Sequence, residues 1–440
     1  MAIDAPARAV LPEVRRPLSP LERWYWIADQ VSPLNVIARV RVTGRLTPSL
    51  LRQALGALRV RHPLLRVAIE SGADGPCFVP TDAPIPLRWV AGTADDDWLR
   101  QINEHEMVQA VDWRTGPLCR TVVVTNDDVH DLILTLPHCI ADGTTVLSLV
   151  KDWLTLAAGR GSDVREPGLP ASEEMFPRRH RGRAGARRLR WQRSRDDRRL
   201  RRLRPARVEP SEFVPFTARR TRVVHRSLSA DQVDALLRAC RRERTTVHGV
   251  LAAAMVAAVA GDGPERPAGV AIGSPINFRD GLVPPVPDTA VGTYVATVGS
   301  LVPVETSLWS MARTISRDLV RRKRRGEHFG MVNLVGGSCP MTVEESAPLI
   351  DFIETQGPVN LCISNIGRYD FPASIGPWQL SGAQFLAGLS VCGYFVATVN
   401  TSHDRLHWNF SYVEGGLPRD RAVRLVAASF DAVLAALGEE

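Results

Sequence analysis

Residues 134–145 read LTLPHCIADGTT and predict a strand, a short loop and a helix in direct succession. The apolar residues before Pro137 are typical of a buried strand that the proline ends, and a helical pattern runs from Gly143 to Ala157. His138 therefore follows the strand end, and Asp142 stands immediately before the helix. A loop of this kind holds a side chain in place and exposes it in a cleft, so we expect the functional site here.

The residue types in this loop suit acid–base chemistry. His138 can act as a general base, because an imidazole with an unperturbed pKa of about 6.5 is largely neutral at cellular pH. The Asp142 carboxylate can fold back under the loop and fix its shape. The Gly143 amide can donate to a developing oxyanion, and the residue has no Cβ to crowd a substrate. The pattern H-x-x-x-D-G alone arises easily by chance among ten histidines, so its context must carry the prediction.

Other catalytic sites find less support in the sequence. His138 and Asp142 could be two ligands of a metal ion, but no third ligand follows at a suitable spacing, so we expect no metal. His403 and His407 flank a predicted hairpin turn and fit surface or strand roles. A G-x-S-x-G motif is absent, and the nearest approach, GGSCP at residues 336–340, lacks the final glycine. A serine hydrolase is therefore disfavoured.

The first half of the chain alternates strands and helices. Residues 36–42 alternate apolar side chains with arginines, which predicts a half-buried strand. A helix follows, with Thr47 as its cap and Pro48 at its first position. Residues 118–125 and 129–136 are predicted strands joined by an Asn-Asp-Asp turn. This succession is typical of an α/β fold.

The second half begins again with a strand and a helix. The strand at 221–228 precedes a helix that Ser229 opens, with Gln232 three residues later in a capping-box pattern. Further helices and strands are predicted at 247–260, 269–275, 290–304, 308–324, 359–364, 378–385, 393–401, 406–412 and 419–437.

An arginine-rich segment separates the two halves. Residues 178–204 contain fourteen arginines in twenty-seven positions and few apolar residues. We expect a solvated helix or crossover that folding does not require; the alternative is a docking surface for something acidic, such as a carrier protein, nucleic acid or a membrane face. Nucleic acid is disfavoured, because aromatic residues are not interleaved and no recognised motif accompanies the run. The predicted organisation is an N-terminal lobe at 1–176, a linker at 177–215 and a C-terminal lobe at 216–440.

Composition excludes several classes of function. A hydrophobic fraction of 45% and a charged fraction of 23% are typical of a soluble chain with two or three cores. Lys151 and Lys323 are the only lysines among 55 basic residues, so Schiff-base or P-loop chemistry has almost no residue to use. No G-K-[ST] triplet occurs, which excludes a Walker-type nucleotide site. The seven cysteines are scattered and lack C-x-x-C spacing, as expected of a reduced cytosolic protein.

The sequence predicts a soluble, cytoplasmic protein. The first twenty residues carry acid, arginine and proline where a signal peptide has an apolar run. The longest apolar stretch, residues 250–260, is too short to span a bilayer and is better interpreted as a buried helix. We expect a monomer, because two lobes in one chain can build a site between them.

Five blocks in order along the chain give the H-x-x-x-D-G pattern its context. They read LSPLERWYW, LNVIARVRVTGRLTPSLLRQALGALRVRHPLLR, LPHCIADGTT, GSPINFRDGL with VGTYVATV, and SNIGRYDFP. Together they resemble the acyltransferase branch of the condensation-domain superfamily. The resemblance is greatest to PapA5-like O-acyltransferases of the phthiocerol dimycocerosyl transferase type.

The resemblance implies an α/β fold of two chloramphenicol-acetyltransferase-like lobes in a V, with the site in a tunnel between them. An acyl-CoA or acyl-carrier-protein thioester would enter from one side as co-substrate, and a hydroxyl acceptor from the other, with no bound cofactor. His138 would be the base. Asp142 would be structural and would pair with an arginine of the second lobe, for which Arg279 stands at the matching position. Breaking such a buried pair would be costly.

Other residues are weaker candidates for the tunnel. Ser364 and Asn365 stand in the S-N-x-G position with Gly367, where a substrate role and a structural turn are equally plausible interpretations. Tyr294, with Thr293 before it, is a candidate for lining the tunnel. Two aromatic residues near the start of the chain, Trp24 and Tyr25, are expected to pack in the core or between the lobes.

Departures from the family pattern favour ester formation. Members that condense amino acids carry two consecutive histidines, and here Pro137 replaces the first. The D-F-G-W-G motif of the plant-type branch is also missing. The sequence thus predicts an O-acyltransferase acting on a hydroxyl of a lipid, sugar or polyketide-type metabolite. An amide-forming condensation enzyme and a non-catalytic module that binds a carrier protein are the alternatives; the acidic carrier would dock on the arginine-rich segment.

Overall fold

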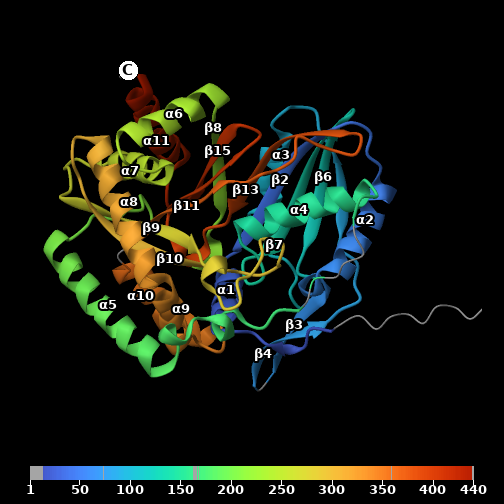
Figure 1. Ribbon diagram of the computed structural model, residues 1–440, viewed down its shortest axis with the longest axis horizontal. Helices are drawn as coiled ribbons and strands as arrows, with labels where there is room; N and C mark the ends of the chain where they lie inside the picture. Colours follow the sequence, from blue (N-terminus) through green and yellow to red (C-terminus); the bar gives the residue numbers. More distant parts are fainter. Residues whose placement is uncertain (1–12, 73, 162–165, 167, 358, 439–440) are drawn as a thin grey trace, which may run out of the picture.

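Two six-stranded sheets lie side by side, and helices cover them (Figure 1). The computed structural model describes residues 13–438 apart from residues 73, 162–165, 167 and 358. The sheet built mainly from the first half occupies the right of the view, and the sheet of the second half the left. The α/β fold with two lobes, which the sequence predicted, is confirmed.

The N-terminal sheet is antiparallel except at one edge, where its last two strands run parallel. Its strands lie in the order β12 (Ser374–Ile375), β13 (Trp378–Ala387), β2 (Asn35–Thr43), β7 (Val129–Pro137), β6 (Arg120–Asn126) and β5 (Leu87–Ala91). A small separate sheet has the order β1 (Arg16–Pro17), β4 (Gly75–Pro80) and β3 (Val67–Gly72).

The C-terminal sheet is mixed, with β11 parallel to both of its neighbours. Its strands lie in the order β10 (Val295–Pro303), β9 (Gly269–Asn277), β11 (Leu361–Arg368), β14 (Phe395–Ser402), β15 (Arg405–Val413) and β8 (Thr221–Leu228). The predicted strand at 221–228 is confirmed, whereas the strand predicted from 290 begins only at Val295, after the loop that carries Thr293 and Tyr294.

Strand β13 joins the N-terminal sheet, although the sequence assigned its residues to the C-terminal lobe. It pairs with β2 along Gln379–Ala387, with an irregularity between Ser381 and Gln384. Side chains of the other sheet also bind its backbone: the Asn400 Nδ2 donates to the Ala383 carbonyl at 2.9 Å, and the Asn409 Nδ2 to the Phe385 carbonyl at 3.1 Å. The predicted C-terminal lobe of residues 216–440 therefore does not coincide with the C-terminal sheet, because the chain enters the N-terminal sheet at β13 and then returns.

Strand β2 is buried on both faces rather than half-buried. Its apolar face belongs to the core under the helices, as the alternation predicted. On the other face Arg39 is only 5% exposed, pairs with Asp131 at 2.5 Å and lies 4.6 Å from the Trp98 ring. Burial lowers the pKa of Arg39 to about 10, although the Asp131 carboxylate opposes the shift. The arginines that look solvent-facing in the sequence are thus partly enclosed.

Two helices cover the N-terminal sheet and place the predicted loop. Helix α2 (Pro48–Arg61) starts at the expected Thr47 cap, and α4 (Gly143–Ala157) has the predicted bounds. Helix α4 packs on both α2 and the sheet, and the Trp153 indole donates to the Leu51 carbonyl at 3.1 Å. The start of α4, and with it the loop after β7, is fixed by this core.

The C-terminal sheet is covered by a helical layer around one fully apolar helix. Nearly every residue of α7 (Val247–Ala260) is buried, because other helices pack on it as well as the sheet. Its neighbours are α8 (Leu308–Arg325) and α11 (Arg419–Gly438), and α6 (Ala230–Arg242) also contacts it. The capping box that Ser229 and Gln232 predicted at the start of α6 is confirmed.

The arginine-rich segment forms a helix that lies on the C-terminal lobe. Helix α5 (Gly182–Leu203) packs against α9 (Glu327–Ser338) at the outer edge in Figure 1. Its Arg195 bonds Glu327 at 2.7 Å, and its Asp196 bonds the buried Arg322 of α8 at 3.1 Å. The sequence prediction of a helix holds, but one side of it is held by ion pairs to the buried residues Glu327 and Arg322.

One of the remaining helices connects the two halves. Helix α1 (Pro20–Val31) contacts β7 of the first sheet and α9 of the second half. It starts with a Ser19–Glu22 capping box that the sequence analysis did not use. Two short helices, α3 (Asp97–Gln101) and α10 (Ala347–Gln356), complete the fold.

Candidate active site

His138 lies in the turn that follows β7, close to where the two sheets meet. Its backbone amide donates to the Leu34 carbonyl at 3.0 Å, and the Ile140 amide donates to the Pro137 carbonyl at 3.2 Å. Pro137 itself pairs with Asn35, the first residue of β2. The turn is therefore anchored to the strand before it and to the segment that precedes β2.

Tyr25 stacks face to face on the His138 imidazole. The two ring centroids are 4.2 Å apart and the planes differ by 2°. The His138 Nδ1 atom is buried and has no hydrogen-bond partner among the described residues. Stacking on Tyr25 is thus a major constraint on the orientation of the imidazole.

From the sequence alone, only a packing role is expected for Tyr25. The residue does contact the apolar core as a partly buried side chain, but it also contacts the predicted base. Nothing in the sequence pairs the LSPLERWYW block with the His138 loop, because α1 and β7 meet only in the folded chain. Trp24, its neighbour, packs as expected on a small apolar cluster around Ala28.

Burial keeps the imidazole neutral. It lowers the pKa of His138 below the usual 6.5, while the backbone of His138 and Ala141 and the Asp142 carboxylate oppose the shift. An imidazole with a pKa below 6.5 is unprotonated at neutral pH and able to accept a proton.

Asp142 turns away from His138 and serves as the N-cap of α4. Its Oδ1 accepts from the Thr145 amide at 3.0 Å, and its Oδ2 accepts from the Tyr294 amide at 2.9 Å. The side chain is 1% exposed. This carboxylate therefore fixes the start of α4 and, through Tyr294, the loop before β10.

Arg279 of the C-terminal lobe meets Asp142 through two bonds. Its Nη1 donates to Asp142 Oδ2 at 2.7 Å, and its Nη2 to Asp142 Oδ1 at 3.0 Å and to the Thr145 hydroxyl at 2.8 Å. The Thr145 hydroxyl donates in turn to the Gly292 carbonyl at 2.8 Å. The guanidinium is 4.5 Å from the Tyr294 ring centre. This buried cluster connects the two lobes.

The electrostatics of the pair favour its charged form. Burial acts to raise the pKa of Asp142, but the Arg279 guanidinium and the amides of Thr145 and Tyr294 outweigh it and hold that pKa below its usual value. Burial also raises the pKa of Tyr294 to about 12, so its phenol is neutral at cellular pH.

Gly143 is required for close packing between α4 and β13. A Cβ at this position would lie 2.6 Å from the Phe385 ring of β13. That the missing Cβ also leaves room for a substrate stays a prediction. Its amide belongs to the first turn of α4, where amides have no partner within the helix, so a role toward an oxyanion stays a prediction.

Ser364 and Asn365 lie on β11, near a bulge in its pairing with β14. The Asn365 Oδ1 accepts from the Gly367 amide at 2.8 Å, and Gly367 has a φ of +79°. Asn365 thus stabilises the turn within its own strand. Within the described part of the chain, no hydrogen bond joins Ser364 or Asn365 to the His138 loop.

The tunnel between the lobes that the family resemblance implies stays a prediction, as do the roles of Thr293 and Tyr294 in lining it. Both residues are buried and line a small hollow of about 40 Å³ beside Glu22 and His62, and the Thr293 hydroxyl has no partner among the described residues. His138 is not among the residues that line this hollow.

Across the described residues, no three His, Cys, Asp or Glu side chains lie close enough together to hold a metal ion. In the same part of the chain, no helix is both long and apolar enough to cross a membrane.

The chain is similar to a known protein family and to several solved structures. Residues 217–373, less than half of the chain, match the family described as "Phthiocerol/phthiodiolone dimycocerosyl transferase C-terminus". The fold is similar to polyketide synthase associated protein 5 from Mycobacterium tuberculosis, with a TM-score of 0.68 and 17% identity over 97% of this chain and 99% of that one. It is equally similar to the epimerization domain of tyrocidine synthetase B, with a TM-score of 0.68 and 15% identity over 98% of this chain and 99% of that one. The family match supports the resemblance over residues 217–373, and the two solved structures show the same fold over nearly the whole chain.

A curated relative extends the comparison to peptide synthesis. Phosphinothricin tripeptide synthetase PhsC from Streptomyces viridochromogenes is 30% identical over 173 residues, which are 36% of this chain. The match spans only 16% of that synthetase. A dimycocerosyl transferase family and a peptide synthetase thus both match, which supports a condensation-domain transferase in the general sense of acyl transfer or condensation.

Proposed function

We propose that this protein is an O-acyltransferase. It moves an acyl group from a CoA or acyl-carrier-protein thioester to a hydroxyl of a lipid, sugar or polyketide-type metabolite. The observation that carries the proposal is the neutral imidazole of His138, which stacks on Tyr25 at the junction of the two lobes. Four residues further along the chain, Asp142 forms a buried ion pair with Arg279 of the other lobe.

In the proposed reaction, His138 Nε2 takes the proton of the acceptor hydroxyl as its oxygen attacks the thioester carbonyl. The C–O bond forms and a tetrahedral oxyanion develops, to which the Gly143 amide is a candidate donor. The intermediate then collapses, the C–S bond breaks, and the imidazolium returns its proton to the thiolate. No covalent acyl-enzyme is formed.

Asp142 acts on the geometry of this reaction and not on the proton. Both of its oxygens are occupied by Arg279 and by the amides of Thr145 and Tyr294. It is a positioning residue for the turn that carries His138, and Arg279 supports it from the second lobe.

Amide formation is the second candidate, and the match to a peptide synthetase favours it. Pro137 in place of a first histidine supports ester formation instead. To separate the two, the protein would be given one acyl-CoA series together with equal concentrations of matched alcohol and amine acceptors. Ester as the main product, identified by mass spectrometry, supports the proposal. Amide as the main product overturns it, and binding of an acyl carrier protein without any product favours a non-catalytic module.

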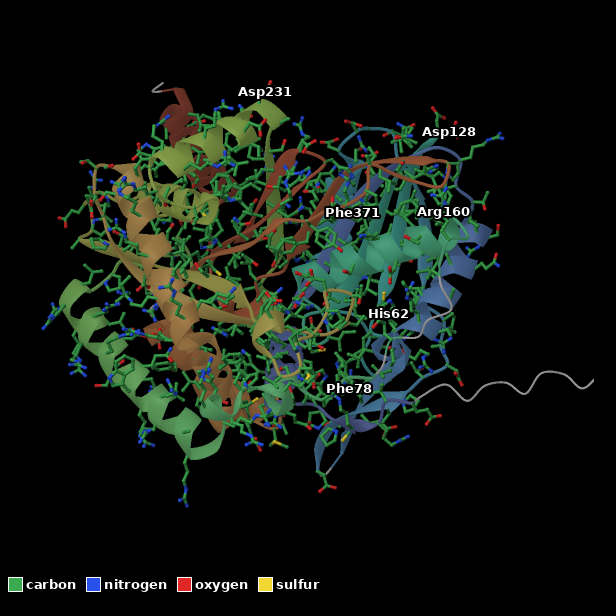
Figure 2. All side chains as sticks on the ribbon, viewed as in Figure 1. His62, Phe78, Asp128, Arg160, Asp231 and Phe371 are labelled. Carbon is green, nitrogen blue, oxygen red and sulfur yellow. The ribbon has the colours of Figure 1, made fainter. Side chains whose placement is uncertain are left out.

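An acidic acyl carrier protein is a proposed donor partner, and α5 is its proposed docking site. Most arginines of this helix are exposed, and nitrogen-tipped side chains project outward along it (Figure 2). Deleting residues 178–204 would not be a suitable test, because Arg195 and Asp196 form ion pairs with the buried Glu327 and Arg322. Changing the exposed Arg187, Arg190 and Arg193 to Gln would instead weaken carrier binding at low salt if the helix is the docking site.

A further inference from the structure

A second hollow, separate from the His138 turn, lies on the outer side of the C-terminal lobe. It has a volume of about 460 Å³ and is formed by the connection between α6 and α7 together with the exposed side of α8. Guanidinium groups dominate its lining: Arg244, Arg317, Arg321, Arg324 and Arg325. No aspartate or glutamate is among the lining residues.

The floor of this arginine hollow is polar and closely packed. Ser316 is 8% exposed. Its hydroxyl is hydrogen-bonded to the hydroxyls of Thr245 at 3.0 Å and Thr246 at 2.8 Å. A Cβ on Gly249 would lie 2.2 Å from Ser316 Oγ, so α7 and α8 are in direct contact at this point. Three hydroxyls are thus held in one place beneath the arginines.

The positive charge of the hollow is only partly neutralised by the protein. Arg321 pairs with Asp318, and Arg325 lies 3.9 Å from Glu327, which is already bonded by Arg322 and Arg195.

The other three, Arg244, Arg317 and Arg324, are exposed, and no ion pair joins them to any residue that the structure describes. Like charges brought this close repel one another, and a bound anion removes the repulsion.

We propose that the arginine hollow binds the phosphate groups of a small nucleotide-like molecule. Guanidinium groups bind phosphate oxygens in pairs of hydrogen bonds, and hydroxyls supply further donors. The volume is that of a ligand site, larger than one phosphate requires. Val320, 49% exposed at the rim, offers an apolar contact to the rest of such a ligand. The proposal does not depend on the chemistry at His138.

The test is direct binding at fixed ionic strength by calorimetry, with ATP, CoA, dephospho-CoA and inorganic pyrophosphate as probes. The variant R317Q/R324Q removes two arginines that no described carboxylate neutralises. The matched control, R52Q/R424Q, removes the same charge from two exposed positions outside the hollow. We expect binding of the diphosphate-bearing probes to weaken about ten- to a hundredfold in the first variant and less than threefold in the control.

The four probes also distinguish the source of the phosphate. Tighter binding of CoA than of dephospho-CoA identifies the extra 3′-phosphate as part of the ligand, and equal binding of ATP, CoA and dephospho-CoA identifies the shared diphosphate; either result supports the proposal. Two results overturn it: no binding of any probe at millimolar concentration, or equal weakening in both variants. Unchanged circular dichroism and melting temperature show that each variant is folded.

Discussion

Two arginines are buried to the same depth in this protein but are satisfied differently. Arg279 and Arg322 are each 2% exposed. Arg279 meets a single carboxylate, that of Asp142 across the lobe junction, at 2.7 and 3.0 Å. Arg322 meets three carboxylates at 2.7–3.1 Å, those of Asp196, Asp318 and Glu327.

The difference is one of redundancy. Among the described residues, Asp142 has no second cationic partner, and its other partners are amides. The ion pairs around Arg322, which attach α5 to the C-terminal lobe, have additional partners. Glu327 is also bonded by Arg195 at 2.7 Å, and Asp318 accepts from the Ser300 hydroxyl at 2.9 Å. The lobe junction therefore depends on one pair, whereas the attachment of α5 is shared among several. A single substitution should separate the two regions.

The largest effect is expected for Arg279→Ala. It leaves the Asp142 carboxylate buried without a cation, which should reduce the free energy of unfolding by about 3–5 kcal/mol. Denaturant unfolding followed by circular dichroism measures this loss. The double variant D142L/R279M removes both charges and should regain most of the stability. A single variant as stable as the wild type would show that the pair does not hold the lobes.

Arg322→Ala should cost less, about 1.5–3 kcal/mol, because Glu327 and Asp318 keep other partners. The same unfolding measurement applies. Arg198→Ala is the matched control on the exposed side of α5, where the guanidinium bonds only the Ser194 carbonyl, and it should change stability by less than about 0.5 kcal/mol. A loss for Arg322→Ala greater than that for Arg279→Ala would reverse the comparison.

At the junction, the Tyr25 stack should affect rate more than stability. An aromatic pair contributes about 0.5–1.5 kcal/mol, so Tyr25→Ala should slow acyl transfer about two- to tenfold through misorientation of the His138 ring. Tyr25→Phe keeps the ring and should retain most of the rate. Steady-state measurement of thiol release gives both values; equal rates for all three proteins would show that the stack has no role.

The pH dependence of transfer should be the smallest change. Burial lowers the pKa of His138, so the base is unprotonated at pH 7 and the rate should fall only as the pH drops below about 6.5. Two histidines near the α5 attachment, His180 and His328, have pKa values lowered by burial to about 4 and should not titrate in this range. An acidic inflection above pH 7 in the rate profile would contradict the assignment.

Local patterns explain which elements the sequence predicted. The bounds of α4 and the caps of α2 and α6 follow from short-range signals: a proline, a side chain that accepts from the first turn, and an apolar stripe. Arg279 was placed against Asp142 only through the family resemblance, since the two residues lie on different lobes.

Contacts between distant segments were beyond these patterns. In the sequence, Arg322 is indistinguishable from its neighbours in the run RRKRR, and only the packing of α5 on α8 and α9 buries it. The alternation of apolar and polar residues in β13 is compatible with either sheet, and only its pairing with β2 in the folded chain assigns it to the N-terminal sheet. The stack of Tyr25 on His138 likewise arises where α1 crosses the end of β7.

The central claim, that His138 is the base of an acyl transfer, is tested most directly by thiol release from a series of acyl-CoAs of increasing chain length. Wild type and His138→Ala would be compared, with a hydroxyl acceptor present, after circular dichroism has shown both to be folded. The account predicts release by the wild type and a loss of about a hundred- to ten-thousandfold in the variant. A variant that releases thiol at a rate near that of the wild type would contradict it.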